Sequence, residues 1–203
     1  MVVSERGSYC PAFLRGLLFL FAASLYNSFM ARVFVAIPVS SELQKEILAW
    51  EDNFQKLPVR WLSGKNLHIT LVPPWEESNP SEVAQLLENL RGTLPQFSFL
   101  LEHVAYGSNS REPRLVWAEG NPPQSIIELK TAVEECLALP IDEKPFRLHL
   151  TLARFRPEIF SSFPIKKLDE RVMWEEYVTS FVLMESHLSP QGADYEVLYE
   201  VKL

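Results

Sequence analysis

Two stretches of the chain, "NLHITLVPP" at residues 66–74 and "RLHLTLARF" at residues 147–155, share the pattern Leu-His-x-Thr-Leu. The chain has only 4 histidines, and two of them stand in this frame, each followed two positions later by a threonine. Polar and apolar residues alternate in both stretches, which is typical of a strand with one buried face. The polar positions of the pair are His68, Thr70, His149 and Thr151. The repetition predicts two related strands that present the same side chains.

The segments around these strands indicate a duplicated fold. In each half of the chain, a strand and then a helix are predicted before the His-x-Thr strand. These are strand 32–37 and helix 41–54 in the first half, and strand 115–119 and helix 125–139 in the second. The other predicted elements are strands at 59–62, 97–106, 177–187 and 194–201, and a helix from Asn79-Pro80 to Gly92. Ser41 and Gln44 stand in capping-box positions of the first helix.

The order of these elements favours one fold class. Helices and strands are mixed, and many connections have hairpin length, which favours antiparallel sheets over a doubly wound parallel sheet. We therefore expect an α+β fold that is bilobal and pseudo-duplicated. It would have two antiparallel sheets, helices packed outside them, and a central cleft.

The composition limits the function classes. A chain of 203 residues with 47% hydrophobic residues can bury a substantial core. The net charge of -7 gives no general attraction for nucleic acid, so a phosphate ligand needs a local cluster of positive groups. Cys10 and Cys136 fit neither a metal site nor a disulfide framework, which is consistent with a reducing compartment.

The first 29 residues differ from the rest. Residues 16–29, "GLLFLFAASLYNSF", are strongly apolar and follow Arg6 and Arg15, but they are shorter than the ~20 residues that a membrane-spanning helix needs. Met30 directly precedes a predicted strand. We expect residues 1–29 to be an apolar leader or upstream extension, and residues 30–203 to form a single bilobal domain in the cytoplasm. Membrane association through residues 1–29 is the alternative.

The paired motifs predict acid-base chemistry on a phosphodiester. Side chains two apart in a strand share a face, so each strand offers one imidazole and one hydroxyl. If the halves are related by a pseudo-twofold axis, the two faces meet across the cleft. One imidazole can then take a proton from a nucleophile while the other gives a proton to the leaving oxygen, each for about 10²–10⁴-fold in rate. Threonine hydroxyls can donate to the phosphate oxygens. This spacing supplies no metal cage, so no metal and no cofactor are expected.

Other basic and aromatic residues stand close to the two motifs in the sequence. Arg154 follows the second motif and is predicted to contact phosphate. The basic residues expected to be solvated strand-end charges are Arg60, Lys65, Lys144 and Arg147. The aromatic residues that either stack on a base or pack in the core are Trp61, Trp75 and Phe146. His103 and His187 are expected to be structural or solvated.

Because it has both His-x-Thr motifs, the chain resembles the 2H phosphoesterase superfamily, in particular the bacterial 2′-5′ RNA ligase-like RNA 2′,3′-cyclic phosphodiesterases. The resemblance runs from about Met30 to the C-terminus and includes "RVFVAIPV", "VRWLSGKNLHITL", "HLTLARF" and "ESHLSPQGADYEVL". The chain departs from the family pattern after the first motif, where residues 72–75 read "VPPW" instead of Phe-Leu-Gly. It departs again before the second histidine, where Leu148 replaces a frequent proline. Both departures concern the cleft wall and leave base or chain-length preference open.

The resemblance implies cofactor-free hydrolysis of RNA 2′,3′-cyclic phosphate ends to a 2′-phosphate, together with reversible 2′-5′ joining of RNA ends at the same site. It implies His68 and His149 as the catalytic pair, with Thr70, Thr151 and Arg154 binding substrate. His68 is assigned as the acid and His149 as the base, although pseudo-symmetry permits the reverse. The expected ligands are RNA ends or nucleotide cyclic phosphates, and a monomer without a protein partner is expected.

Two rival functions follow from the same residues. The substrate of the first is another cyclic or linear nucleotide phosphodiester. The second is a non-catalytic module that binds RNA ends, although binding alone would not need two proton carriers. Turnover of a short RNA that ends in a 2′,3′-cyclic phosphate separates all three functions.

Overall fold

The computed structural model describes residues 30–109, 111–140, 144–190 and 192–203. Residues Ala31–Leu203 form one compact unit. The leader or extension predicted for residues 1–29 lies outside the described residues, as does Cys10. Among the residues that are described, no helix is long and apolar enough to cross a membrane.

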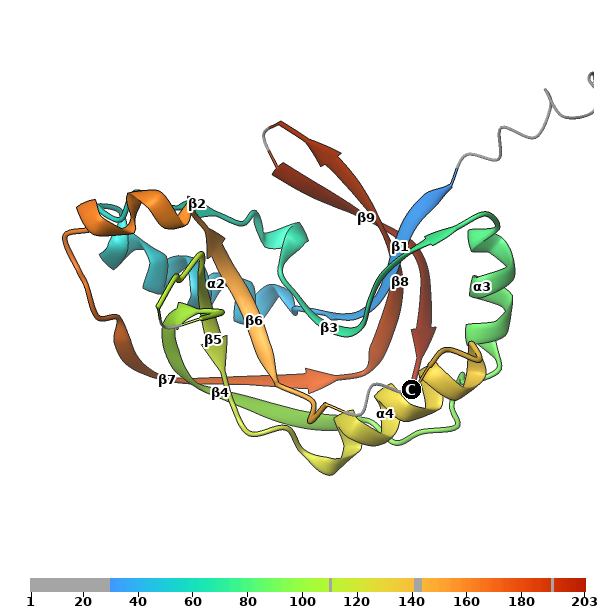
Figure 1. The fold of residues 1–203 in the computed structure, drawn as a ribbon. Helices are drawn as coiled ribbons and strands as arrows, with labels where there is room; N and C mark the ends of the chain where they lie inside the picture. The colour runs from blue at the N-terminus through green and yellow to red at the C-terminus, as the bar shows by residue number, and fades with distance from the viewer. Residues whose placement is uncertain (1–29, 110, 141–143, 191) are drawn as a thin grey trace, which may run out of the picture. The chain divides into compact units, whose positions relative to one another are not determined.

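Two antiparallel sheets make up this unit (Figure 1). The four-stranded sheet has the order β3-β1-β8-β9, and the five-stranded sheet has the order β2-β6-β5-β4-β7. The strands of the first sheet are β1 (Ala31–Pro38), β3 (His68–Glu77), β8 (Ser180–Ser189) and β9 (Gly192–Lys202). The strands of the second are β2 (Arg60–Trp61), β4 (Phe97–Gly107), β5 (Leu115–Glu119), β6 (His149–Arg154) and β7 (Asp169–Val178). Every strand pairing is antiparallel, as the sequence predicted.

The two halves of the chain repeat one arrangement. In the first half, β1 is followed by a helix, the short strand β2 and then β3, and β1 pairs with β3. In the second half, β5 is followed by a helix and then β6, and β5 pairs with β6. The α-helices described are α2 (Ser41–Glu51), α3 (Pro80–Glu88) and α4 (Gln124–Cys136), and the 3-10 helices are η2 (Asp52–Phe54), η3 (Gly64–Asn66) and η4 (Pro157–Ser162). The predicted α+β, pseudo-duplicated fold is confirmed.

Each connecting helix packs against the sheet of the other half. Helix α2 follows β1 but contacts β7, and Trp50 of α2 packs edge to face on Trp174 of β7 with 5.8 Å between ring centroids. Helix α4 follows β5 but contacts β3 and α3. The main buried cluster accordingly draws residues from both sheets and all three helices. This exchange holds the two sheets together and fixes their His-x-Thr strands relative to each other.

Strand β7 was not predicted from the sequence. Its inward positions include Trp174 and Val178, but the inward position between them is Glu176, which breaks the apolar alternation. Glu176 can be buried there because its carboxylate accepts a hydrogen bond of 2.9 Å from the backbone N–H of Ser40. The predicted hairpin strand 177–187 was also wrong at its start, since residues 177–178 end β7 and β8 begins at Ser180.

Several helix ends differ from the prediction. The N-cap of α2 is Ser40, whose hydroxyl accepts from the backbone N–H of Leu43 at 3.2 Å, and not Ser41. Helix α3 ends at Glu88; Gly92 lies beyond it with φ of +65°. Asn79 caps α3 and Pro80 opens it, as predicted. The sequence signals thus located each helix but placed some of its ends one turn away.

Glu51, the last residue of α2, makes the stability of the folded protein depend on pH. Burial raises the pKa of Glu51 to about 7 from 4.5, and its Oε1 atom has no hydrogen-bond partner in the described parts of the chain. Between pH 4.5 and 7 the unfolded chain has released a proton that the folded protein still holds, so the free energy of unfolding falls as pH rises through this window.

Replacing Glu51 with glutamine should therefore stabilise the protein above this window. We expect the free energy of unfolding to rise by about 1–3 kcal/mol at pH 8 and to change little at pH 4. Denaturant unfolding at both pH values measures this, with Glu46→Gln on the exposed face of α2 as the matched control. A gain of equal size at both pH values would mean that ionisation of Glu51 is not its cause.

Candidate active site

The two motif histidines occupy equivalent positions in the two sheets. His68 is the first residue of β3 and His149 is the first residue of β6. Strands β3 and β6 contact each other although they belong to different sheets (Figure 1). The charge of His149 acts on the pKa of His68, so the two imidazoles share one electrostatic environment. The duplicated stretches are thus brought next to each other.

Both imidazoles are anchored in the same way. The Nδ1 atom of His68 lies 2.8 Å from the carbonyl oxygen of Asn66, and Nδ1 of His149 lies 3.0 Å from that of Arg147. A carbonyl oxygen only accepts hydrogen bonds, so Nδ1 carries the hydrogen in each ring. In the neutral form Nε2 then holds the lone pair. Each half-site therefore offers Nε2 for proton transfer.

Each motif strand contains a β-bulge just after its threonine. The bulge determines which later residue projects from the same face of the strand as the histidine and threonine. In β6, Trp117 pairs with Thr151 but the adjacent Val116 pairs with Ala153, so Leu152 is the extra residue. Leu152 and Ala153 are both buried, and Arg154 returns to the exposed side. The bulge explains how Arg154, three positions after Thr151, shares a face with the motif.

The same irregularity occurs in β3 with a different outcome. Ala36 pairs with Thr70 and Val35 with Val72, so Leu71 is the extra residue. The position equivalent to Arg154 is then Pro73, which offers neither charge nor a hydrogen-bond donor. The two half-sites match in histidine and threonine, but only the second one has an arginine.

A cavity of about 400 Å³ lies over the first half-site. Its lining brings His68 and Thr70 of β3 together with Arg154 of β6. The other lining residues are Arg32, Phe34, Pro74, Ser186, Leu188, Ala193 and Tyr195. His149 and Thr151 are half-buried and do not line this cavity. The structure thus joins three of the five predicted site residues in one cavity, with the second histidine close enough to act electrostatically.

The surroundings of His68 keep it neutral in the ligand-free protein. Its ring packs between Phe34 and Tyr195, with centroid distances of 4.9 Å and 5.0 Å. Burial, followed by the charges of Arg154 and His149, lowers the pKa of His68 to about 4, although its bond to the Asn66 carbonyl acts in the opposite direction. A free imidazolium is therefore disfavoured here until a negative ligand offsets the nearby positive charges.

His149 stands in a more polar setting. Its ring packs edge to face on Trp117 at 5.2 Å, and the guanidinium of Arg147 lies 4.2 Å above the same indole. Arg147 also forms an ion pair with Glu119, with 2.6 Å between its Nη2 atom and Oε2. Arg147 is exposed, as predicted for a strand-end charge, and it also contacts Trp117 and Glu119 beside the second histidine.

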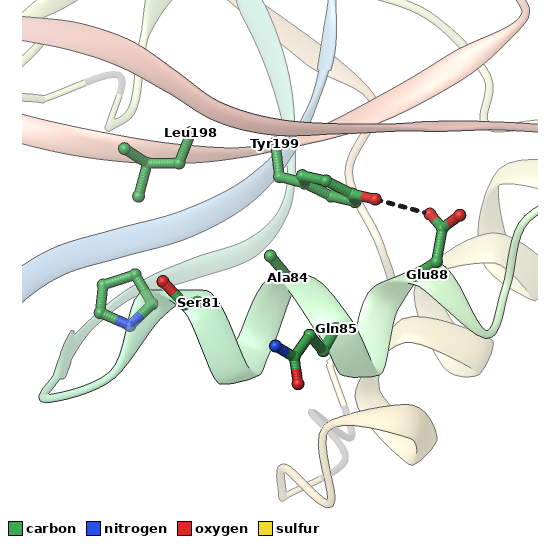
Figure 2. Close-up of a pocket in the computed structure, with 7 residues that line it drawn as sticks. Ser81, Ala84, Gln85, Glu88, Leu198 and Tyr199 are labelled. Carbon is green, nitrogen blue, oxygen red and sulfur yellow. Dashed lines mark hydrogen bonds between the residues drawn. The ribbon is translucent and has the colours of Figure 1, made fainter.

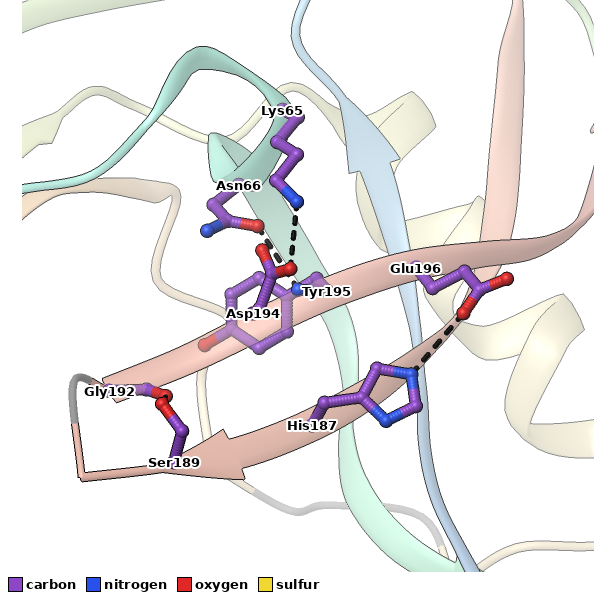
Figure 3. Close-up of polar contacts among 8 residues, drawn as sticks. All are labelled: Lys65, Asn66, His187, Ser189, Gly192, Asp194, Tyr195 and Glu196. Atoms are coloured by element: carbon purple, nitrogen blue, oxygen red, sulfur yellow. Dashed lines mark hydrogen bonds and ion pairs between the residues drawn. The ribbon is translucent and has the colours of Figure 1, made fainter.

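The β8–β9 hairpin is tied to the turn that precedes His68 (Figure 3). The side-chain oxygen of buried Asn66 accepts from the backbone N–H of Tyr195 at 3.1 Å, and Lys65 pairs with Asp194 at 2.7 Å. Asn66 therefore holds the hairpin through its side chain and His68 through its carbonyl oxygen. The hairpin in turn places the Tyr195 ring on His68.

Other residues considered in the sequence lie away from the cavity. His103 contacts Asp169 at 2.5 Å, and His187 contacts Glu196 at 3.3 Å (Figure 3), so both are structural or solvated as predicted. The three aromatic candidates for base stacking pack against the core and do not line the cavity; they are Trp61, Trp75 and Phe146. The aromatic residues beside His68, Phe34 and Tyr195, lie 34 and 127 positions from it, and only the pairing of β1, β8 and β9 around β3 brings them there.

A larger cavity is unrelated to the motifs. It measures about 500 Å³ and lies between α3 and β9 (Figure 2). Its polar contact is a hydrogen bond of 2.9 Å from the Tyr199 hydroxyl to Glu88. No motif residue lines it, so volume alone would misplace the site. Within the described residues, no group of three or more histidine, cysteine, aspartate or glutamate side chains could hold a metal ion.

Fold and site together define a two-histidine phosphoesterase architecture, and comparison with known proteins places the chain in its family. A sequence model of the 2'-5' RNA ligase superfamily matches residues 39–189. The chain therefore belongs to this superfamily, and the resemblance to the 2H phosphoesterases is confirmed.

Individual relatives agree with this assignment. The RNA 2',3'-cyclic phosphodiesterase of Thermotoga maritima is 30% identical to this chain over 182 residues, which cover 83% of this chain and 94% of that protein. A protein of the same name from Methanocaldococcus jannaschii is 26% identical over 178 residues, covering 83% and 99%. The structure of E. coli LigT complexed with 3'-AMP matches with a TM-score of 0.66 and 25% identity over 86% of this chain and 98% of that one. TT0787 of Thermus thermophilus has the same fold, with a TM-score of 0.68 and 24% identity over 85% and 97%.

Proposed function

We propose that this protein hydrolyses RNA 2′,3′-cyclic phosphate ends to 2′-phosphate ends by a two-histidine mechanism that needs no metal. The observation that carries the proposal is the pair of equally anchored imidazoles, one from each sheet, on contacting strands. The relatives named RNA 2',3'-cyclic phosphodiesterase support the substrate class.

In the proposed reaction, a water molecule attacks the phosphorus of the cyclic phosphate. His149 takes the proton of that water at Nε2 as the new P–O bond forms. The bond between phosphorus and the 3′ oxygen breaks, and His68 gives the proton on its Nε2 to that oxygen. Thr70, Thr151 and Arg154 hold the phosphate oxygens, on which negative charge increases. A 5′-hydroxyl that replaces water would give a 2′-5′ bond instead, so the same site supports reversible ligation.

The acid role of His68 depends on the substrate. The pKa of His68 is about 4 without ligand, so the free imidazole is neutral at pH 7. A phosphate anion beside Arg154 would offset the guanidinium charge and favour the imidazolium. His68 is therefore proposed to become protonated as the cyclic phosphate binds. We further propose that the domain of residues 30–203 works as a cytoplasmic monomer without a protein partner.

Turnover after metal removal tests the proposed function. The full chain, treated with EDTA, should convert a short RNA with a 2′,3′-cyclic phosphate end entirely to the 2′-phosphate, at the rate of the untreated protein. Phosphorus NMR distinguishes this product from the 3′-phosphate. A complete loss that a divalent ion restores would contradict the metal-free mechanism. Binding without any turnover would favour the RNA-end binding module instead.

A further inference from the structure

Two arginines lie side by side at one end of the five-stranded sheet. Arg60 of β2 stands directly opposite Arg154 of β6, and residues directly opposite in an antiparallel pair project from the same face. Both are exposed, and neither forms an ion pair with any residue that the structure describes. Like charges in this position destabilise a sheet, so the pairing has a cost unless an anion lies between them.

The side chain of Arg60 lies against the tip of the β8–β9 hairpin. A Cβ atom at Gly192, which has φ of +119°, would lie 1.5 Å from Nη1 of Arg60. The guanidinium of Arg60 therefore lies against the backbone of Gly192. The next residue, Ala193, lines the same cavity as Arg154 and His68. Arg60 does not itself line the cavity, but both the residue opposite it, Arg154, and the residue after Gly192 do.

Two other cations close to the cavity, Arg32 in its lining and Lys65 before His68, have acidic partners. Arg32 pairs with Glu76 at 3.3 Å, and Lys65 pairs with Asp194 at 2.7 Å. In a chain of net charge -7, two adjacent guanidiniums without acidic partners provide the local positive field that a polyanion needs. Arg154 lines the cavity together with His68, whereas Arg60 lies opposite Arg154 and against Gly192 of the hairpin.

We propose that Arg60 forms a second phosphate subsite, which binds the phosphodiester on the 5′ side of the terminal nucleotide while Arg154 holds the reacting phosphate. The inference rests on the proposed function and names its substrate class. The preferred substrate is an RNA end of two or more nucleotides, and a free nucleoside 2′,3′-cyclic phosphate leaves this subsite empty. Arg60 therefore has a binding role beyond that of the solvated strand-end charge predicted from the sequence.

The test compares Arg60→Gln with the wild type on two substrates. For a dinucleotide that ends in a 2′,3′-cyclic phosphate, kcat/KM should fall about tenfold more than for the mononucleoside 2′,3′-cyclic phosphate. The slope of log kcat/KM against log salt for the dinucleotide should become shallower by about 0.7, the value for one phosphate contact on a single strand. Arg171→Gln, an exposed arginine on β7 at the far edge of the same sheet, is the matched control and should affect both substrates equally.

Equal losses of kcat/KM on the two substrates would overturn the proposal. Arg60 would then have only a structural role beside the hairpin. A binding measurement separates this outcome from failure of the proposed function. The Kd of a dinucleotide 2′-phosphate should rise about tenfold in Arg60→Gln, whether or not the protein turns over cyclic phosphates. If the wild type hydrolyses neither substrate while this Kd still rises, the proposed function fails and the subsite stands. An unchanged Kd rejects the subsite.

Discussion

Replacing His68 or His149 with asparagine is expected to lower kcat/KM for a 2′,3′-cyclic phosphate end by about two to four orders of magnitude in each case. Asparagine suits the test better than alanine because its side-chain N–H group can donate to the carbonyl oxygens of Asn66 and Arg147 as Nδ1 does now. The variants keep this anchoring donor and lose the group that exchanges a proton. The loss should therefore fall on kcat.

The two remaining histidines provide the control for this experiment. His103→Asn and His187→Asn each remove an exposed imidazole that contacts a carboxylate outside the cavity, and both should keep the wild-type rate. Near-normal turnover in either motif variant, with folding shown intact by circular dichroism, would reject the two-histidine mechanism. Loss in a motif variant accompanied by loss in a control variant would indicate a general effect of histidine replacement.

The motif strands could be predicted because their local pattern agrees with their tertiary environment. The leucines beside His68 and His149 point into the core, and the alternation of polar and apolar residues follows directly from that burial. Duplication added the second piece of information, since a single His-x-Thr strand would have meant little. Fold class and the histidine pair were therefore accessible from the residues alone.

The remaining features depend on contacts between distant parts of the chain. Asn66 links His68 to the hairpin through the backbone of Tyr195, 129 positions away, and nothing in the local pattern indicates that bond. Arg60 lies opposite Arg154 through a strand of two residues and against Gly192, 132 positions away, and neither contact is indicated by the local sequence. The adjacent buried pair Leu152-Ala153, which breaks the alternation, was a readable sign of the bulge that turns Arg154 toward the motif.

The roles of the two histidines should separate on a substrate whose leaving group needs no proton. For a 3′-deoxynucleoside 2′-(4-nitrophenyl phosphate), in which nitrophenolate takes the place of the 3′ oxygen as leaving group, His68→Asn is expected to recover to within about tenfold of the wild type, because nitrophenolate departs without an acid. His149→Asn should stay two to four orders of magnitude slower, because water still has to lose a proton. Release of nitrophenolate, followed by its absorbance, measures both.

The pH dependence of wild-type turnover is a second test of the two-histidine mechanism. The kcat/KM profile reports the free protein, so the profile for a cyclic phosphate should be bell-shaped with its acidic limb near pH 4, the pKa of His68 without ligand. The limbs belong to the coupled pair and do not assign the roles, which is why the nitrophenyl substrate is needed. If His149→Asn recovers and His68→Asn does not, the neutral imidazole of ligand-free His68 is the base, and the assignment is reversed while the mechanism stands. A wild-type profile that is flat between pH 4 and 9, with the chemical step rate-limiting, would remove the mechanism itself.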